Sequence, residues 1–178
     1  MTRNILITLV LLAGLAFACE KEDDTPAGKR VDIYRLADYK TAVGSARIID
    51  STVMLDEDVL IPFNEMIAYN KKNHTFTVTE QIAEKLNDTG ENPFHRTGFA
   101  VTVDQQVIYT GYFWAGYSSA TCDWVIIDPL NYASKDDGAG NKLEVRLGYP
   151  TAFEGVPDQR NDRRILEVFR LHEKLKPF

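Results

Sequence analysis

The residue types best suited to chemistry gather in residues 109–124, which hold six aromatic side chains, four serine or threonine hydroxyl side chains and one thiol. A cysteine or serine nucleophile needs a histidine base nearby in space and a group that orients the base. The three histidines of the chain are scattered and match no recognised signature: His74, His95 and His172. The sequence therefore favours a buried structural Cys122 over a nucleophile, and it predicts no catalytic residue.

The aromatic side chains of this segment suggest a binding surface. Alternation along an extended strand sends Tyr112 and Trp114 to one face, and the flanking Gly111 and Gly116 indicate a bulge or a close approach of backbone or ligand. Together with Tyr117, these rings would form a platform for a glycan or an extended peptide, because Trp and Tyr combine large contact areas with polar tips. In the alternative, most rings fill the core of a small sheet, and Trp114 and Tyr117 stay exposed.

Basic residues near the carboxyl terminus extend this candidate surface. Arg160 and Arg164 open the last predicted helix, and their guanidinium groups are suited to an anionic ligand. The alternative is that they form ion pairs with neighbouring Asp and Glu side chains. The predicted ligand-binding residues are thus Tyr112, Trp114, Tyr117, Arg160 and Arg164.

Metal-binding patterns are missing from the sequence. It has no His-x-x-x-His pair and no Cys-x-x-Cys pair, which zinc sites use. Residues 136–141 lack the alternating oxygen ligands and the distal Glu of a calcium loop. There is also no Gly-rich phosphate loop. No metal and no cofactor are predicted.

The amino terminus carries a targeting pattern. Residues 1–4 form a short segment made basic by Arg3, and residues 5–15 form an apolar run that is too short to span a bilayer, which takes about 20 residues. The motif Ala16-Phe17-Ala18-Cys19 follows and leads into polar and acidic residues. This arrangement resembles the signal peptide of bacterial lipoproteins, although Ala16 stands where leucine is usual. The resemblance implies that residues 1–18 are removed and that Cys19 is acylated. The alternative is an ordinary secretory signal cleaved near Ala18, and either way the mature protein leaves the cytoplasm.

The residues after Cys19 point to the cell envelope. Residues 19–24 resemble the acidic segment that sends some Gram-negative lipoproteins to the cell surface, so we expect the protein on the outer membrane, with the surface or periplasmic face left open. Residues 19–29 read as an acylated, flexible tether, and the lipid makes the membrane a partner. If Cys19 is acylated, Cys122 is the remaining free thiol and no intramolecular disulfide forms.

Residues 30–178 are expected to form a single domain. Seven or eight short strands and two helices, without βαβ alternation, predict an α+β fold with a mostly antiparallel sheet. The clearest hairpin is expected to turn through a three-residue loop or a bulge, because it lacks the glycine of a two-residue turn. Residues 64–69 are expected to form a helical turn or a short strand. The helices are predicted at residues 79–86 and 161–171, capped by Thr79 and by Asn161 or Asp158. The strands are predicted at residues 31–36, 46–50, 52–55, 75–79, 99–103, 107–113, 124–128 and 143–147. Residues 59–63 are predicted as an edge segment or a loop entry, because Pro62 cannot donate to a ladder.

The body of the chain has two weak resemblances. A helix followed by Phe99-Ala-Val-Thr-Val-Asp-Gln-Gln-Val-Ile is similar to the first periplasmic domain of the SecDF translocation accessory protein, over about residues 75–110. The rest is similar to uncharacterised envelope lipoproteins, which imply no particular activity. Both resemblances imply an α+β fold in the cell envelope, and neither identifies a residue of a functional site.

Composition narrows the class of function. The 178 residues are 44% hydrophobic and 26% charged, with a net charge of -6, which argues against a nucleic-acid partner because such proteins carry a basic footprint. The favoured hypothesis is a non-catalytic module that binds a glycan, a peptide or an envelope protein. The alternatives are a small carboxylate-dependent hydrolase of envelope polymers and a structural subunit of an outer-membrane assembly.

Overall fold

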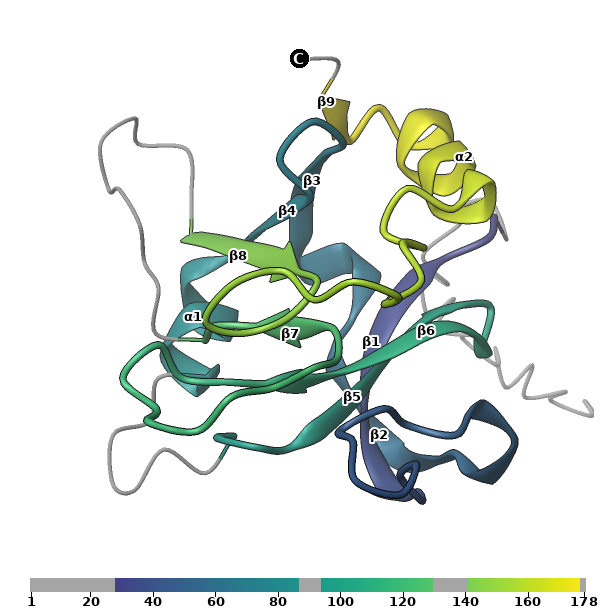
Figure 1. The fold of residues 1–178 in the computed structure, drawn as a ribbon. Coiled ribbons are helices and arrows are strands. Elements are labelled where there is room, and N and C mark those ends of the chain that lie inside the picture. The colour runs from purple at the N-terminus through teal and green to yellow at the C-terminus, as the bar shows by residue number, and fades with distance from the viewer. Residues whose placement is uncertain (1–27, 87–93, 130–140, 177–178) are drawn as a thin grey trace, which may run out of the picture.

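The described part of the protein is one curled sheet with two helices (Figure 1), which confirms the predicted α+β fold. The computed structural model describes residues 28–86, 94–129 and 141–176, so the predictions for the signal peptide, Cys19 and most of the tether lie outside it. The helices are α1 (Glu80–Leu86) and α2 (Arg163–Leu171), with single 3-10 turns η1 (Asp50–Thr52) and η2 (Phe63–Glu65). The strands are β1 (Val31–Asp38), β2 (Met54–Ile61), β3 (Met66–Asn70), β4 (Thr75–Val78), β5 (Gly98–Val103), β6 (Gln106–Phe113), β7 (Ile126–Ile127), β8 (Asn141–Arg146) and β9 (Leu175–Lys176).

The order of the strands requires the sheet to curl. They run β2-β1-β5-β6-β7-β8-β4-β3-β9, and among the described strands β6–β7 and β3–β9 pair in parallel. β2 and β3 follow each other in the chain but lie seven positions apart in this order. A flat sheet would separate them by about 34 Å at ~4.8 Å per strand, whereas the chain from Ile61 to Met66 spans at most about 18 Å. The two ends of the sheet therefore approach each other around η2.

One face of the sheet and both helices enclose the main hydrophobic cluster, which we call the inner core. Strand positions such as Ile33, Val101 and Val145 alternate into it, and Phe63 of η2 packs there as well. The apolar stripe of α2 enters through Ile165, Val168 and Phe169, as predicted from their spacing, and α1 contributes Ile82 and Leu86.

The opposite face of the sheet carries a second cluster, which we call the outer core. Its members are Leu36, Ile48, Ala100, Tyr112, Trp114, Cys122, Trp124 and Ile126. Long loops rather than helices cover it. Asp123 joins two of them, because its carboxylate accepts hydrogen bonds of 2.7 Å from the Ser45 hydroxyl and from the Ala46 N–H. The short hairpin between Thr41 and Ile48 is thereby held against the outer core.

The hairpin formed by β5 and β6 differs from its prediction in the turn. Two residues, Asp104 and Gln105, connect the strands, and both have left-handed φ angles of 48° and 64°. The predicted three-residue loop is wrong, whereas the predicted bulge appears as a register shift between Val101 and Thr102. The turn tolerates the absence of glycine because its Asp104 carboxylate accepts a hydrogen bond from the Arg30 N–H and its Asp104 N–H donates to the Arg30 carbonyl.

Several element boundaries also differ. Residues 46–50 form no strand, because their backbone pairs with the hairpin partner Thr41 at a single bridge. The strand expected at residues 124–128 shrinks to β7, and the expected helix at residues 161–171 begins at Arg163 with Asp162 as its N-cap. Residues 59–63 are predicted as an edge segment or a loop entry, and β2 lies at the edge of the sheet and ends at Ile61. The two-residue strand β9 has too short a pattern to be visible in the sequence.

Candidate binding site

The predicted aromatic residues separate into buried and exposed side chains. Tyr112 and Trp114 belong to the outer core, and Trp114 is 6% exposed, so the expectation that it stays at the surface is wrong. Alternation along β6 turns both rings inward, where Tyr39 packs on Tyr112 and His95 packs on Trp114. Tyr117, by contrast, is 68% exposed, as expected.

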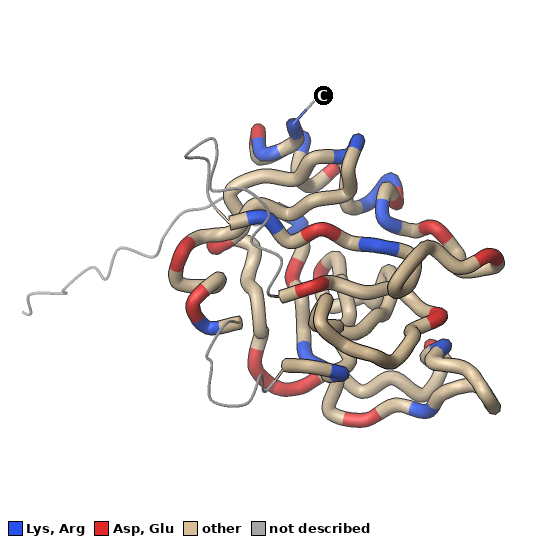
Figure 2. Tube along the Cα trace, turned by 60° about the vertical axis from the view of Figure 1, so that its left-hand side comes forward, with Lys and Arg blue, Asp and Glu red and all other residues tan. Residues whose placement is uncertain are grey.

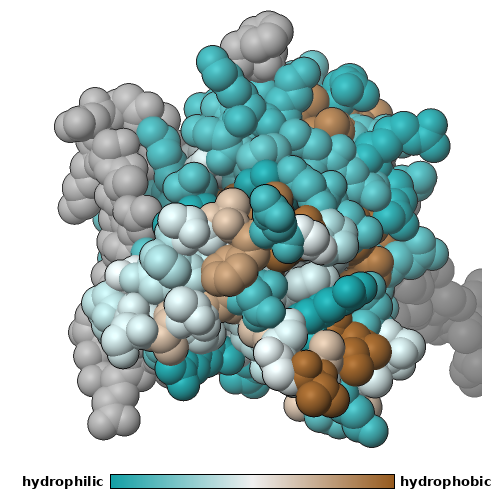
Figure 3. Space-filling view, in the orientation of Figure 1, coloured by the Kyte–Doolittle hydropathy of each residue, from teal (hydrophilic) through white to brown (hydrophobic). Residues whose placement is uncertain are grey.

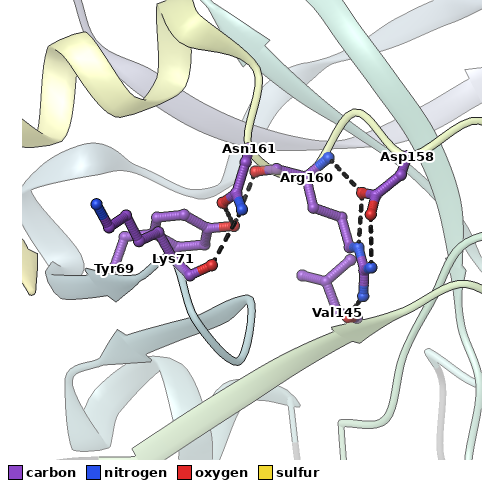
Figure 4. Close-up of polar contacts among 6 residues, drawn as sticks. All are labelled: Tyr69, Lys71, Val145, Asp158, Arg160 and Asn161. Carbon is purple, nitrogen blue, oxygen red and sulfur yellow. Dashed lines mark hydrogen bonds and ion pairs between the residues drawn. The ribbon is translucent and has the colours of Figure 1, made fainter. Parts of the chain in front are cut away.

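Arg160 is used within the protein, in a network that fastens the carboxyl-terminal segment to the sheet (Figure 4). Its guanidinium forms a forked contact with Asp158 at 2.9 and 2.8 Å and donates to the Val145 carbonyl at 3.0 Å. Its own carbonyl accepts from the hydroxyl of Tyr69 at 2.7 Å. The hydrogen bond with Arg160 holds the pKa of the Asp158 carboxyl below its ordinary value. Asn161 adds a hydrogen bond to the Lys71 carbonyl.

The structure does not bring the predicted arginines to the aromatic residues. Arg164 pairs with Asp162, the N-cap of α2, at 2.9 Å. Arg160 lies on the side of the inner core, next to Tyr69, whereas Tyr112 and Trp114 face the outer core. The alternative weighed from the sequence, pairing with neighbouring carboxylates, therefore describes both arginines.

A different set of side chains lies next to the loop that carries Tyr117, at the place where two parallel strands end. β6 and β7 pair through Tyr112–Ile126 and Phe113–Ile127, and the Trp114 N–H continues the ladder to the Ile127 carbonyl at 2.8 Å. The segments that follow both strands consequently leave the sheet at one edge. One segment carries Tyr117 and the other begins with Asp128.

Arg146 of β8 completes this edge. It lies opposite Ile126 in the antiparallel pair of β7 and β8, and its guanidinium is 3.9 Å from the buried carboxylate of Asp128. Arg146 also lies over the ring of Tyr149, 5.8 Å from the centroid. Gly116 passes so close that a Cβ atom there would stand 2.5 Å from Oδ2 of Asp128. The Tyr149 hydroxyl donates to the Gly116 carbonyl at 2.6 Å and clamps the loop in place.

His95 also lies next to Tyr117. Its Nδ1 accepts a hydrogen bond from the Ala115 N–H at 3.2 Å, and its ring centroid lies 5.3 Å from Trp114 and 6.1 Å from Tyr117. Burial, and then the positive charge of Arg96, lower the pKa of His95, while Asp128 opposes this effect. The imidazole is therefore neutral at pH 7, and acceptance at Nδ1 assigns its proton to Nε2. We call Tyr117, His95, Asp128 and Arg146 the Tyr117 site.

The Tyr117 site contains three residues that the sequence did not point to. His95, Asp128 and Arg146 come from a turn, a strand end and another strand, and no spacing in the chain links them. A weak signal existed at Asp128, which closes an apolar run just before Pro129. Its partner Arg146 points outward from β8, as a solvated charged residue does. The pair of Arg146 and Asp128 therefore becomes visible only from the register between the strands.

Among the described residues, the other reactive groups have few of the properties that catalysis needs. Burial raises the pKa of the Cys122 thiol to about 11, and the residue is almost fully enclosed by the outer core, as expected of a structural cysteine. Residues 28–86, 94–129 and 141–176 contain no group of three His, Cys, Asp or Glu side chains placed to hold a metal ion. The described carboxyl groups with a shifted pKa all move downward, toward the charged form: Asp56, Asp123, Asp158 and Asp162.

Comparisons and surface properties add three findings. No family model matches the sequence, and no curated protein or solved structure matches it either. Along the described segments, positive and negative side chains are interspersed (Figure 2). None of the helices in these segments has the length and apolar character needed to cross a membrane.

Proposed function

We propose that the protein is a lipid-anchored module of the cell envelope that binds a glycan at the Tyr117 site. The anchor rests on the lipoprotein-like pattern that ends at Cys19. The binding role rests on the site, and a non-catalytic role fits its composition. A neutral imidazole, a carboxylate and a guanidinium supply donors and acceptors for sugar hydroxyls, and the aromatic ring supplies a flat apolar face.

The observation that carries this proposal is the exposure of Tyr117 beside fixed polar groups. Its ring remains in solvent while the neighbouring Tyr112 and Trp114 are buried, and the adjacent Gly116 lies against the carboxylate of Asp128. A protein gains nothing in its own stability from leaving a large ring in water. Binding sites commonly combine such a ring with a few polar groups that fix the orientation of the ligand.

The test is binding of oligosaccharides, first on an array and then by calorimetry. Tyr117→Ala should weaken binding at least about tenfold, because an aromatic contact contributes about 1 kcal/mol or more beyond its area. Tyr117→Phe keeps the ring and should retain most of the affinity. Leu171→Ala is the matched control, since Leu171 is 67% exposed on α2, which packs on the opposite face. Equal binding by the Tyr117→Ala protein and the wild type would refute the proposal.

The hydrolase alternative makes a separate prediction for the same site. A carboxylate-dependent hydrolase would release reducing ends from envelope polymers, and Asp128→Asn would abolish that release. A binding module releases none with either protein. Product formation that requires Asp128 would therefore replace the proposed function with the enzymatic one.

An exposed apolar surface favours one further candidate, a subunit of an outer-membrane assembly. Apolar atoms gather over the connection between β1 and β2, at the lower right of Figure 3. The exposed large side chains of this part of the chain are Val43, Ile49 and Met54. Val43→Asp should then reduce cross-linking to an envelope protein without affecting glycan binding.

The anchor is tested by fractionation of cells. Cys19→Ala should move the protein from the membrane fraction to the soluble fraction, because acyl chains supply about 0.8 kcal/mol of membrane affinity per buried methylene. Cys122→Ala is the control and should stay with the membrane. Retention of the Cys19→Ala protein would contradict the anchor while leaving the Tyr117 site untouched.

A further inference from the structure

Three arginines lie over aromatic rings on the face of the sheet that carries the Tyr117 site. Arg47 lies 5.6 Å from the ring centroid of Trp124, Arg96 lies 5.3 Å from that of Trp114, and Arg146 lies 5.8 Å from that of Tyr149. Trp114 and Trp124 belong to the outer core, and Tyr149 packs against it. Stacking leaves the edges of a guanidinium free to donate hydrogen bonds.

Two of these arginines have no ion pair with a described carboxylate. Arg146 is neutralised by Asp128, whereas neither Arg47 nor Arg96 has a carboxylate oxygen within 4.0 Å among the described residues. The other ion-paired arginines of the described segments lie elsewhere: Arg35 with Asp56, Arg160 with Asp158 and Arg164 with Asp162. Arg47 and Arg96 thus place two guanidinium groups without a described carboxylate partner on one face of a protein whose net charge is -6.

The backbone holds both arginines in place. Arg47 belongs to the hairpin that Asp123 fastens through Ser45 and Ala46, and its carbonyl accepts from the Ala42 N–H at 2.9 Å. Arg96 donates its N–H to the Phe113 carbonyl at 2.7 Å and has a left-handed φ of 65°, which is costly for a residue other than glycine. The backbone of both arginines is therefore fixed before a ligand binds.

The spacing along β6 separates the two positive groups. Trp124, under Arg47, donates its Nε1–H to Thr110, and Trp114, under Arg96, lies four residues further along the same chain segment. At ~3.3 Å per residue, the backbone positions beneath the two arginines are about 13 Å apart. A ligand that contacts both arginines is therefore longer than one sugar unit. The same face also holds buried donors without an acceptor among the described residues, Trp114 Nε1 and Arg146 Nε.

We propose that the glycan bound at the Tyr117 site is anionic, and that its acidic groups pair with Arg96 and Arg47. The proposal rests on the proposed function, because it specifies the ligand class of that site. Each guanidinium offers two parallel donors to an oxyanion, and the geometry suits carboxylate and sulfate groups alike. The ring of Tyr117 contacts the apolar face of one sugar, and the arginines bind the acidic groups along the oligomer.

The experiment compares matched charged and neutral sugars by calorimetry with the full-length protein. An oligogalacturonide is set against its methyl ester, and sulfated dextran is set against unmodified dextran. The wild type should bind at least one charged sugar at least about tenfold more tightly than its neutral match, with an affinity that falls as salt rises. A preference in the first pair identifies carboxylate as the recognised group, and a preference in the second identifies sulfate.

Variants separate the two arginines from general charge effects. Arg96→Gln and Arg47→Gln should each reduce the preference for the charged sugar about threefold or more, and Arg96→Lys should retain part of it. Arg163→Gln is the control, since it removes the same charge from the exposed surface of α2 on the other side of the sheet. An unchanged preference in both Gln variants would overturn the proposal.

The remaining outcomes separate this proposal from the proposed function. Equal binding of charged and neutral sugars that still depends on Tyr117 overturns the anionic ligand and leaves the glycan-binding function in place. Tighter binding of a short DNA duplex than of either acidic sugar overturns the assignment to a glycan. Binding of none of these sugars by the wild type overturns the anionic ligand, and failure across the oligosaccharide array rejects the proposed function itself.

Discussion

The carboxylate of Asp32 in β1 accepts a hydrogen bond of 2.9 Å from the backbone N–H of Phe63 in η2. Both residues are buried, and Phe63 packs in the inner core where the two ends of the curled sheet meet. The contact joins the beginning of the sheet to the turn that leads into β3. It therefore helps to stabilise the curl on which the two faces of the sheet depend.

Asp32→Ala should destabilise the protein by about 1–3 kcal/mol, because it leaves the buried Phe63 N–H without an acceptor. Asp32→Asn keeps an acceptor oxygen and should cost less. Urea unfolding followed by circular dichroism measures both changes. Asp58→Ala removes a carboxylate from the exposed side of β2 and should have little effect. If the Asp32→Ala and Asp58→Ala proteins unfold at the same urea concentration, the curl does not depend on this contact.

Gly116→Ala should weaken ligand binding more than it weakens the fold. The new Cβ would stand 2.5 Å from Oδ2 of Asp128, so the carboxylate or the loop has to move. Binding calorimetry should show a loss of about tenfold, whereas the midpoint of thermal unfolding should change by only a few degrees. Combining the substitution with Asp128→Ala provides the control. The loss from Gly116→Ala should largely disappear in that background, and a full additive loss would show that the two residues act independently.

The stability of the protein should fall as the pH decreases through the ordinary range of histidine. Burial, and then the positive charge of Arg160, lower the pKa of His74. The unfolded chain then takes up the proton first, so the contribution of His74 is complete above an unfolded pKa of about 6.5 and is lost as the pH falls below it. His74→Asn should flatten this dependence. Asparagine also tolerates the left-handed φ of 54° at this position.

Urea unfolding from about pH 8 to about pH 5 measures this effect, in a range above the one in which the lowered carboxyl groups titrate. The comparison at pH 8 is the internal control, because His74 is neutral there in both states and any difference reflects packing alone. An equally steep loss of stability in the His74→Asn protein would assign the pH dependence to other groups.

Cys122 should be unreactive in the folded protein. Its thiol has a pKa of about 11 because of burial, which leaves about a hundredfold less thiolate than an exposed cysteine at the same pH. In the Cys19→Ala protein it is the sole thiol, since the chain has two cysteines. A chromogenic disulfide should label it rapidly in urea and slowly in buffer. Rapid labelling of the folded protein would mean that the outer core opens.

Local patterns determined the parts of the fold that depend on neighbouring residues. The strand alternation in β1, β4, β6 and β8 and the stripe of Ile165, Val168 and Phe169 predicted the α+β class and the buried faces. The turn of the β5–β6 hairpin escaped prediction, because the contact of Asp104 with Arg30 across 74 positions stabilises it. β9 and the boundaries of β7 likewise depend on pairing with distant strands.

The candidate site likewise combines features that the sequence predicted with features that only the tertiary structure decided. The sequence by itself predicted the lipoprotein-like pattern ending at Cys19, since such a pattern is a run of consecutive residues, and it singled out Tyr117 within the aromatic segment. Only the tertiary structure decided that Trp114 is buried and that Arg160 and Arg164 are occupied by carboxylates. Strand register also placed Arg146 beside Asp128, next to the loop that carries Tyr117. Contacts between distant segments have no period in the sequence, so the pairing of β7 with β6 and β8 had to bring these residues together.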